Sequence, residues 1–146
     1  MANATAFGTL IDLALQESDE AARRLGQAVQ ASAQEQEKLD LLIGYQHDYL
    51  QQLGQRLQHG LTVQSHRNYQ DFIAGLDRAI SQQMEVCKTC QQAAANELEM
   101  WRASERKRLS FETLEQRQVL AARRLENRRE QKQTDEHAAR SRRNLH

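Results

Sequence analysis

Cys87 and Cys90 stand three residues apart, the C-x-x-C spacing that redox and zinc sites use. Two thiolates supply half of a closed tetrahedral zinc site, and the sequence offers no second cysteine pair and no neighbouring histidine. Both cysteines also fall on the apolar side of a helical pattern, where free thiols pack as small hydrophobes. We therefore expect no metal at this motif and a packing role for both residues.

The five histidines, at positions 47, 59, 66, 137 and 146, show no metal-ligand spacing such as H-E-x-x-H. No glycine-rich phosphate loop follows a strand-like segment either. An elongated helical chain offers few concave pockets that exclude water. The sequence therefore predicts a protein that is not an enzyme and that holds no cofactor.

The elements that position these residues are predicted to be helices. The chain of 146 residues has no proline, few aromatic residues and a charged fraction of 27%, a composition that favours long helices. Much of its apolar fraction is alanine, which adds little to a hydrophobic core. We expect one all-α coiled-coil domain over residues 1–146 with a narrow apolar seam. The chain carries no apolar run near the roughly 20 residues of a membrane span, which favours a cytoplasmic protein without direct membrane insertion.

Apolar and small residues recur at steps of three and four in two stretches. The spacing predicts a first helix over about 5–57, a turn over about 58–66 with a helix-ending Gly60 and a Ser65 cap, and a longer second helix over about 67–140. If the helices fold back on each other, residue i lies beside a residue near 125 − i. Residues beyond about 122 then have no partner within the chain. The first stripe comprises Ile11, Ala14, Ala21, Leu25, Ala28, Leu39, Leu42 and Leu53, and the second Ile73, Leu76, Ile80, Cys87, Ala94, Leu98, Trp101, Leu109, Leu114, Ala122 and Leu125.

The apolar stripe is too wide for one two-helix interface near the turn. Beside Leu42, Tyr45, Tyr49, Phe72, Leu76 and Ala79 runs an adjacent set that could fill the seam alone: Ile43, Leu50, Ile73 and Ile80. Some apolar and tyrosine-bearing surface should therefore stay exposed. Such a surface is either a protein-docking site or the margin of a broad core.

Charge is distributed unevenly although the net charge is zero. Residues 1–66 hold four basic and eight acidic side chains, whereas residues 102–146 hold thirteen and seven. The basic third indicates an acidic partner surface, nucleic acid, or a solvated helix. Nucleic acid is the less favoured partner, because acidic residues are interspersed and no aromatic stacking platform accompanies the basic ones.

Four segments resemble the flagellar export protein family FliJ when they are taken together and in order. They are Asp19 to Gly26, Leu41 to Tyr49, Asn68 to Ile73, and the C-terminal run Glu126 to Lys132 followed by Asp135 and Glu136; Trp101 and Arg102 also fit. The resemblance covers nearly the whole chain. It implies an antiparallel coiled coil similar to the γ subunit of rotary ATPases, acting without enzymatic activity in the type III export apparatus.

The resemblance also implies partners and sites. The partners are the hexameric flagellar export ATPase, the cytoplasmic domain of the export-gate membrane protein, and empty export chaperones, and the location is the cytoplasmic side of the inner membrane at the flagellar base. The gate-binding residues would be Leu42, Tyr45, Tyr49, Phe72, Leu76 and Ala79. The ATPase-facing residues would be Leu10, Leu13, Asn127, Arg128, Gln131, Lys132, Asp135 and Glu136. The competing interpretation is a homo-oligomeric structural or adaptor coiled coil.

Overall fold

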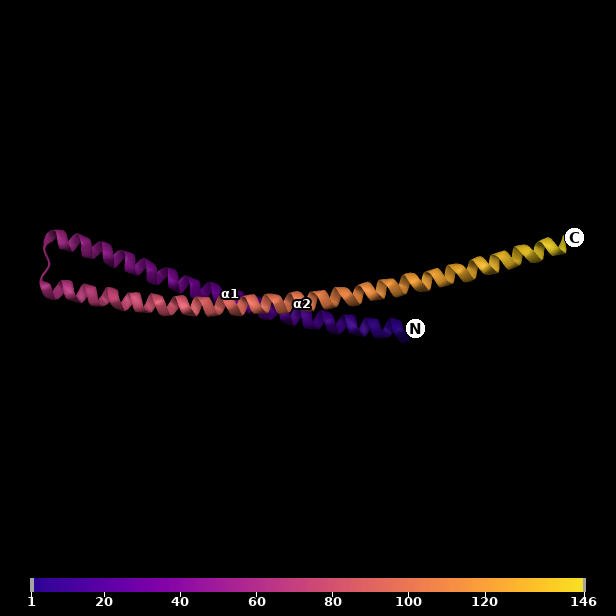
Figure 1. Cartoon of the computed structure of the whole chain (residues 1–146), viewed down its shortest axis with the longest axis horizontal. Helices are drawn as coiled ribbons and strands as arrows, with labels where there is room; N and C mark the ends of the chain where they lie inside the picture. The colour runs from indigo at the N-terminus through magenta and orange to yellow at the C-terminus, as the bar shows by residue number, and fades with distance from the viewer. Residues whose placement is uncertain (1, 146) are drawn as a thin grey trace. The chain divides into compact units, whose positions relative to one another are not determined.

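Two long helices account for the fold in the computed structural model, which describes residues 2–145 and side chains from Ala6 onward. Helix α1 spans Ala2–His59 and helix α2 spans Val63–Asn144 (Figure 1). The helices run in opposite directions from the turn between them, and no strand occurs in the described part of the chain. The predicted all-α antiparallel hairpin with a longer second helix is confirmed.

The turn is shorter than the sequence predicted. Gly60 ends α1 with a φ of 88°, a left-handed conformation that costs glycine little. The hydroxyl oxygen of Thr62 accepts a hydrogen bond from the backbone N–H of Ser65 at 3.1 Å, and the Thr62 carbonyl accepts one from His66 at 3.0 Å. Thr62 is therefore the N-cap of α2. The predicted cap at Ser65 is wrong, because Ser65 already lies in the first turn of the helix.

The chain divides into two compact units, which we describe separately. One unit comprises Asp19–Arg102 and contains the turn, and the other comprises Met1–Ser18 with Ala103–His146. The expectation of a single domain stays a prediction. In each unit a segment of α1 pairs with a segment of α2.

The seam side of α1 follows an unbroken heptad pattern. Its buried and half-buried residues succeed one another at alternating steps of four and three, the repeat of a coiled coil. Polar residues occupy several of these positions, which apolar periodicity alone does not reveal. The series is Phe7, Ile11, Ala14, Ser18, Ala21, Leu25, Ala28, Ser32, Glu35, Leu39, Leu42, Gln46, Tyr49 and Leu53.

Helix α2 carries a matching series. It comprises Tyr69, Ile73, Leu76, Ile80, Gln83, Cys87, Cys90, Ala94, Glu97, Trp101, Ser104, Arg108, Phe111, Glu115 and Gln118. Leu109 and Leu114, which the sequence placed in this stripe, are exposed instead. The heptad repeat explains this exposure, because Arg108 and Phe111 occupy the seam positions and both leucines lie beside them. Ala122 and Leu125, the last predicted members, are exposed as well.

Contacts between the helices test the predicted pairing of residue i with 125 − i. Arg56 lies over the ring of Tyr69, as the rule requires, at 5.5 Å from the ring centroid. Glu17 pairs with Lys107 at 3.2 Å, one residue from the predicted partner. Glu35 contacts Gln83, seven residues from the predicted partner. The observed partners therefore lie within seven residues of the predicted ones.

The core is narrow, as its alanine content predicted. The buried apolar residues are Ala14, Ala21, Leu39 and Cys87, and no large side chain in the described region is fully buried. Small seam residues bury little apolar area each, so apolar packing alone stabilises the pairing weakly. Among the described residues, neither helix has a segment long and apolar enough to cross a membrane.

Candidate binding surfaces

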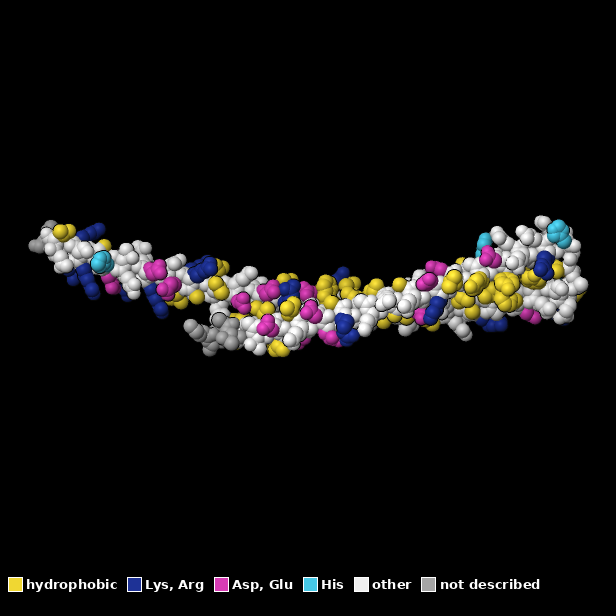
Figure 2. Space-filling view, turned by 180° about the vertical axis from the view of Figure 1, so that it is seen from behind, with side chains coloured by type: hydrophobic (Ala, Val, Ile, Leu, Met, Phe, Trp, Pro, Cys, Tyr) yellow, Lys and Arg dark blue, Asp and Glu magenta, His cyan; other side chains and the backbone are white. Residues whose placement is uncertain are grey.

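An aromatic surface, the hairpin patch, lies near the turn and comprises Leu42, Tyr45, Tyr49, Phe72, Leu76 and Ala79. The rings of Tyr49 and Phe72 meet at 4.3 Å between centroids with an interplanar angle of 42°, so the structure joins the two halves of this set. Figure 2 shows hydrophobic side chains gathered on both helices near the turn. The six residues therefore form one surface within one unit.

Part of the hairpin patch faces solvent. Tyr45 is 54% exposed and Phe72 is 46% exposed, while Leu42, Leu76 and Ala79 are half-buried in or beside the seam. Ile43 and Leu50, from the adjacent set of apolar residues, are exposed, so that set does not fill the seam alone. The predicted exposure of apolar surface near the turn is confirmed. The docking role of that surface stays a prediction.

A polar cluster borders the hairpin patch. The Gln83 amide donates to a carboxylate oxygen of Glu35 at 2.7 Å and to the Glu35 carbonyl at 2.9 Å. Lys38 donates to the other oxygen of the same carboxylate at 3.1 Å. The hydrogen bond from Gln83, followed by that from Lys38, lowers the pKa of Glu35 below its ordinary value. Glu35 is thus held as a carboxylate at a seam position.

The C-terminal end of α2 is a bare helix, which we call the overhang and define as residues 119–144. Every residue of it is exposed, as predicted for a segment beyond the reach of α1. It includes the predicted ATPase-facing residues Asn127, Arg128, Gln131, Lys132, Asp135 and Glu136. Gln131 donates to Asp135 at 3.2 Å, a contact between successive turns on the helix surface. The overhang is a mixed-charge surface with no intrachain packing.

Leu10 and Leu13, the predicted N-terminal part of the ATPase-facing set, lie on α1 beside a part of α2 that precedes the overhang. A groove of about 400 Å³ is lined by Gly8, Ile11 and Asp12 on α1 and by Glu112, Glu115 and Gln116 on α2. Leu10 and Leu13 therefore lie near the level of these α2 residues, roughly 16–23 Å along the helix axis before Asn127. Both leucines are exposed. The structure does not bring them together with the overhang residues.

A second polar cluster lies in the seam of the unit formed by Met1–Ser18 and Ala103–His146. It was not predicted from the sequence. The buried Ser18 hydroxyl donates to Glu105, while Arg108 binds Glu105 at 2.7 Å and Glu112 at 2.8 Å. The Arg108 guanidinium and then the Ser18 hydroxyl lower the pKa of Glu105, and Glu105 in turn raises the pKa of Arg108. The signal for this cluster was its spacing, since Ser18 and Arg108 both continue the heptad repeat.

The cysteines behave as the seam pattern predicted. Cys87 is 4% exposed, Cys90 is half-buried, and both are free thiols. No group of three or more potential metal ligands occurs in the described part of the chain. The predicted position of both cysteines on the apolar side of the helix is confirmed, and their packing role stays a prediction.

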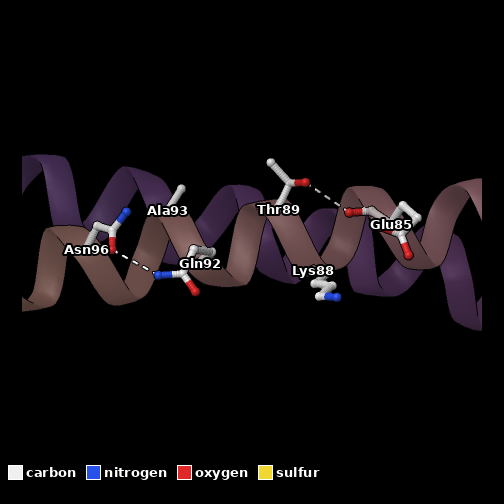
Figure 3. Close-up of a pocket in the computed structure, with 6 residues that line it drawn as sticks. All are labelled: Glu85, Lys88, Thr89, Gln92, Ala93 and Asn96. Atoms are coloured by element: carbon white, nitrogen blue, oxygen red, sulfur yellow. Dashed lines mark hydrogen bonds between the residues drawn. The ribbon is translucent and has the colours of Figure 1, made fainter.

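One further hollow, of about 480 Å³, lies nearby on α2 (Figure 3). Glu85, Lys88, Thr89, Gln92, Ala93 and Asn96 line it. All six come from α2, and α1 runs behind them in the view. The two hydrogen bonds among them, from Thr89 to the Glu85 carbonyl and from Gln92 to Asn96, are local contacts within the helix. The hollow is a surface depression that assembles no nucleophile with a base.

Comparison with known proteins identifies a matching family and similar proteins. The family described as flagellar FliJ protein matches residues 3–144. The flagellar FliJ protein of Escherichia coli strain K12 is 38% identical over 141 residues, covering 97% of this chain and 96% of that protein. The flagellar FliJ protein of Salmonella typhi shows the same identity and coverage. These relatives are named as flagellar proteins and not as enzymes.

Proposed function

Because this chain belongs to the FliJ family of flagellar proteins, we propose that it is a stalk-like, non-enzymatic component of the flagellar type III export apparatus. In this proposal it binds the hexameric export ATPase, promotes ring assembly and turnover, and couples the ring to the export gate. It also escorts empty export chaperones. It acts on the cytoplasmic side, peripherally associated with the inner membrane at the flagellar base.

The overhang is the observation that carries the proposal. A helix with no packed face is marginal by itself in water, because helix stability in proteins comes mostly from tertiary packing. The overhang holds eight Lys and Arg residues and four Asp and Glu residues, all exposed. A polar surface of this kind can engage successive subunits of a ring in turn, where an apolar surface would fix on one of them. These features support insertion of the overhang into the ATPase ring.

The hairpin patch supports the second contact, with the gate. Its exposed Tyr45 and Phe72 can serve as aromatic anchors, the residue type that dominates binding energy at many interfaces. The hairpin patch and the overhang share no residue and belong to different units of the chain, so two partners would not compete for the same side chains. A protein with two independent surfaces suits a coupling role between two partners.

The ATPase contact is tested by measuring turnover and ring formation of the cognate export ATPase with and without this protein. We expect stimulation by the wild type and its loss in the double variant Gln131→Ala/Asp135→Ala. The matched control is Gln92→Ala/Asn96→Ala, which removes an exposed hydrogen-bonded pair of the same i,i+4 spacing from α2. A wild-type protein that leaves turnover and assembly unchanged would rule out the stalk mechanism.

The gate contact is tested by the affinity of Tyr45→Ala for the isolated cytoplasmic domain of the gate protein. Truncation of an interface anchor commonly costs about 2 kcal/mol or more, a loss of roughly 30-fold in affinity. The control is Met84→Ala, because Met84 is also 54% exposed but lies outside the hairpin patch. Equal affinities for the two variants would remove the hairpin patch as the gate-binding surface.

A further inference from the structure

The heptad seam poses a question of register, meaning which residue of α1 lies beside which residue of α2. Both helices repeat without interruption, so a slip by seven residues would again place seam positions opposite seam positions. Apolar packing discriminates weakly between such registers, because the buried apolar residues are few and mostly small. Something other than apolar packing must therefore select the observed pairing.

Within the unit Asp19–Arg102, the polar pair of Glu35 and Gln83 lies at seam positions of both helices. The 2.7 Å and 2.9 Å hydrogen bonds link the amide of Gln83 to the side chain and the backbone of Glu35. Both side chains are half-buried, so neither is fully satisfied by water. Gln83 is not level with Glu35, because the other contacts of this unit align the two helices three to seven residues differently. The Gln83 amide therefore reaches along the seam to Glu35, and the pair forms only when this alignment of the helices is kept.

Slipped registers leave the pair unsatisfied. A slip of seven residues would bring Leu76 or Cys90, in place of Gln83, to the position that contacts Glu35. The same slips would bring Ala28 or Leu42, in place of Glu35, to the position that contacts Gln83. A polar or charged group that loses its partner in a partly buried site destabilises the folded chain. Both slips therefore expose a carboxylate and an amide to apolar neighbours at once.

We propose that Glu35 and Gln83 act as positioning residues that fix the register of the antiparallel hairpin, at some expense of seam stability. A single polar residue in a coiled-coil seam is known to specify register in this way. A second polar contact in the same unit, from Gln46 to Asp77, also joins α1 to α2 and would be broken by a slip of seven residues.

The register determines which side chains form the hairpin patch. In the observed pairing the Tyr49 ring contacts Phe72, whereas a slip of seven residues would bring Tyr49 level with Ser65 or Ala79. Only this consequence for gate binding rests on the proposed function. The register itself is measured without any partner, so the two ideas fail separately.

The experiment compares the double variant Glu35→Leu/Gln83→Leu with the parent protein, both in a Cys87→Ala/Cys90→Ala background. Spin labels on cysteines introduced at the exposed Gln27 and Ser81 report the separation of α1 and α2. A slip of seven residues shifts their axial offset by about 10 Å. We expect one distance in the parent, and in the leucine variant a higher melting temperature together with a second, displaced distance population.

Two further variants separate register selection from a general effect of added leucine. Gln34→Leu/Gln82→Leu places the same side chains at the exposed positions just before each seam residue and should keep the single distance. Glu35→Gln/Gln83→Glu exchanges the two groups, loses the hydrogen bond to the carbonyl of residue 35 but keeps one between the two side chains, and should also keep the single distance. A leucine variant that is more stable yet retains the single parental distance would overturn the proposal, as would a second distance in the exchange variant.

Discussion

At the scale of single residues, polar groups in the seam govern how stability responds to pH. Hydrogen bonds from Gln83 and Lys38 lower the pKa of Glu35 in the folded state. A carboxyl with a lowered folded pKa contributes stability that is present above its unfolded pKa, about 4.3 for glutamate. This stability is lost as the pH falls through the lower, folded pKa.

The variant Glu35→Gln tests this contribution. We expect the wild type to have the higher melting temperature near neutral pH, and the difference from Glu35→Gln to shrink as the pH falls below about 4. Thermal unfolding followed by circular dichroism across that range measures it. Glu37→Gln is the control, since Glu37 is an exposed glutamate outside the seam. A difference that stays constant down to about pH 3 would contradict the assignment.

The buried hydroxyl of Ser18 gives a second prediction at this scale. Ser18→Ala removes the hydrogen bond to Glu105 but leaves Glu105 bound to Arg108. We expect a loss of about 0.5–1.5 kcal/mol in the free energy of unfolding, the usual net value of one hydrogen bond. Urea denaturation measures the change, and Ser81→Ala at an exposed position should alter it by less than about 0.5 kcal/mol. Equal effects of the two substitutions would show that the Ser18 contact is unimportant.

Residue-level prediction from the sequence succeeded for most apolar positions, was wrong for Leu109 and Leu114, and missed the polar seam residues. Leu39, Leu42 and Cys87 were placed on the seam by their spacing, because burial of apolar groups follows the helical repeat. Glu35 and Ser18 were missed because their side chains are usually solvated, and only the partner on the other helix makes burial tolerable. That partner depends on the register, which periodicity alone leaves open.

At the scale of elements, the turn depends on one glycine conformation. Gly60 has a positive φ, whereas Gly54 lies inside α1, and a Cβ added at Gly54 meets nothing within 4 Å. Gly54→Ala should therefore raise the free energy of unfolding by about 0.4–1 kcal/mol, because alanine favours the helix and restricts the unfolded chain. Gly60→Ala should lower it by roughly 1 kcal/mol or more. Chemical denaturation of both variants tests the opposite signs, and two shifts of the same sign would refute this account.

Helix boundaries near the turn illustrate what local sequence leaves open. Gly60 was predicted to end the first helix, and it does so. The second helix begins at Val63, four residues before its predicted start, because Thr62 caps it. A threonine hydroxyl and a serine hydroxyl are both competent caps, and the choice between them depends on the backbone that follows Gly60.

At the scale of the whole molecule, helix packing and the proposed ATPase contact belong to different stretches of the chain. The paired segments carry every buried residue of the described chain, whereas the overhang carries none. Stability of the hairpin should therefore be nearly independent of the overhang. Binding to the proposed ATPase ring should depend on it.

Deletion of residues 123–146 separates these two roles. Residues 123–144 contribute 22 of the 140 residues in the 58-residue and 82-residue helices, so the helical signal should fall by about a sixth. The melting temperature of the remaining hairpin should change by no more than a few degrees, since the removed residues bury nothing against α1. Circular dichroism measures both quantities.

The truncated chain should also lose all stimulation of the ATPase while binding the gate domain normally. The ATPase turnover assay and the gate-domain affinity assay described for the point variants measure these two properties. A large drop in melting temperature would instead show that the overhang packs against the chain, and retained ATPase stimulation would move the proposed ring contact to the paired segments around Leu10 and Leu13.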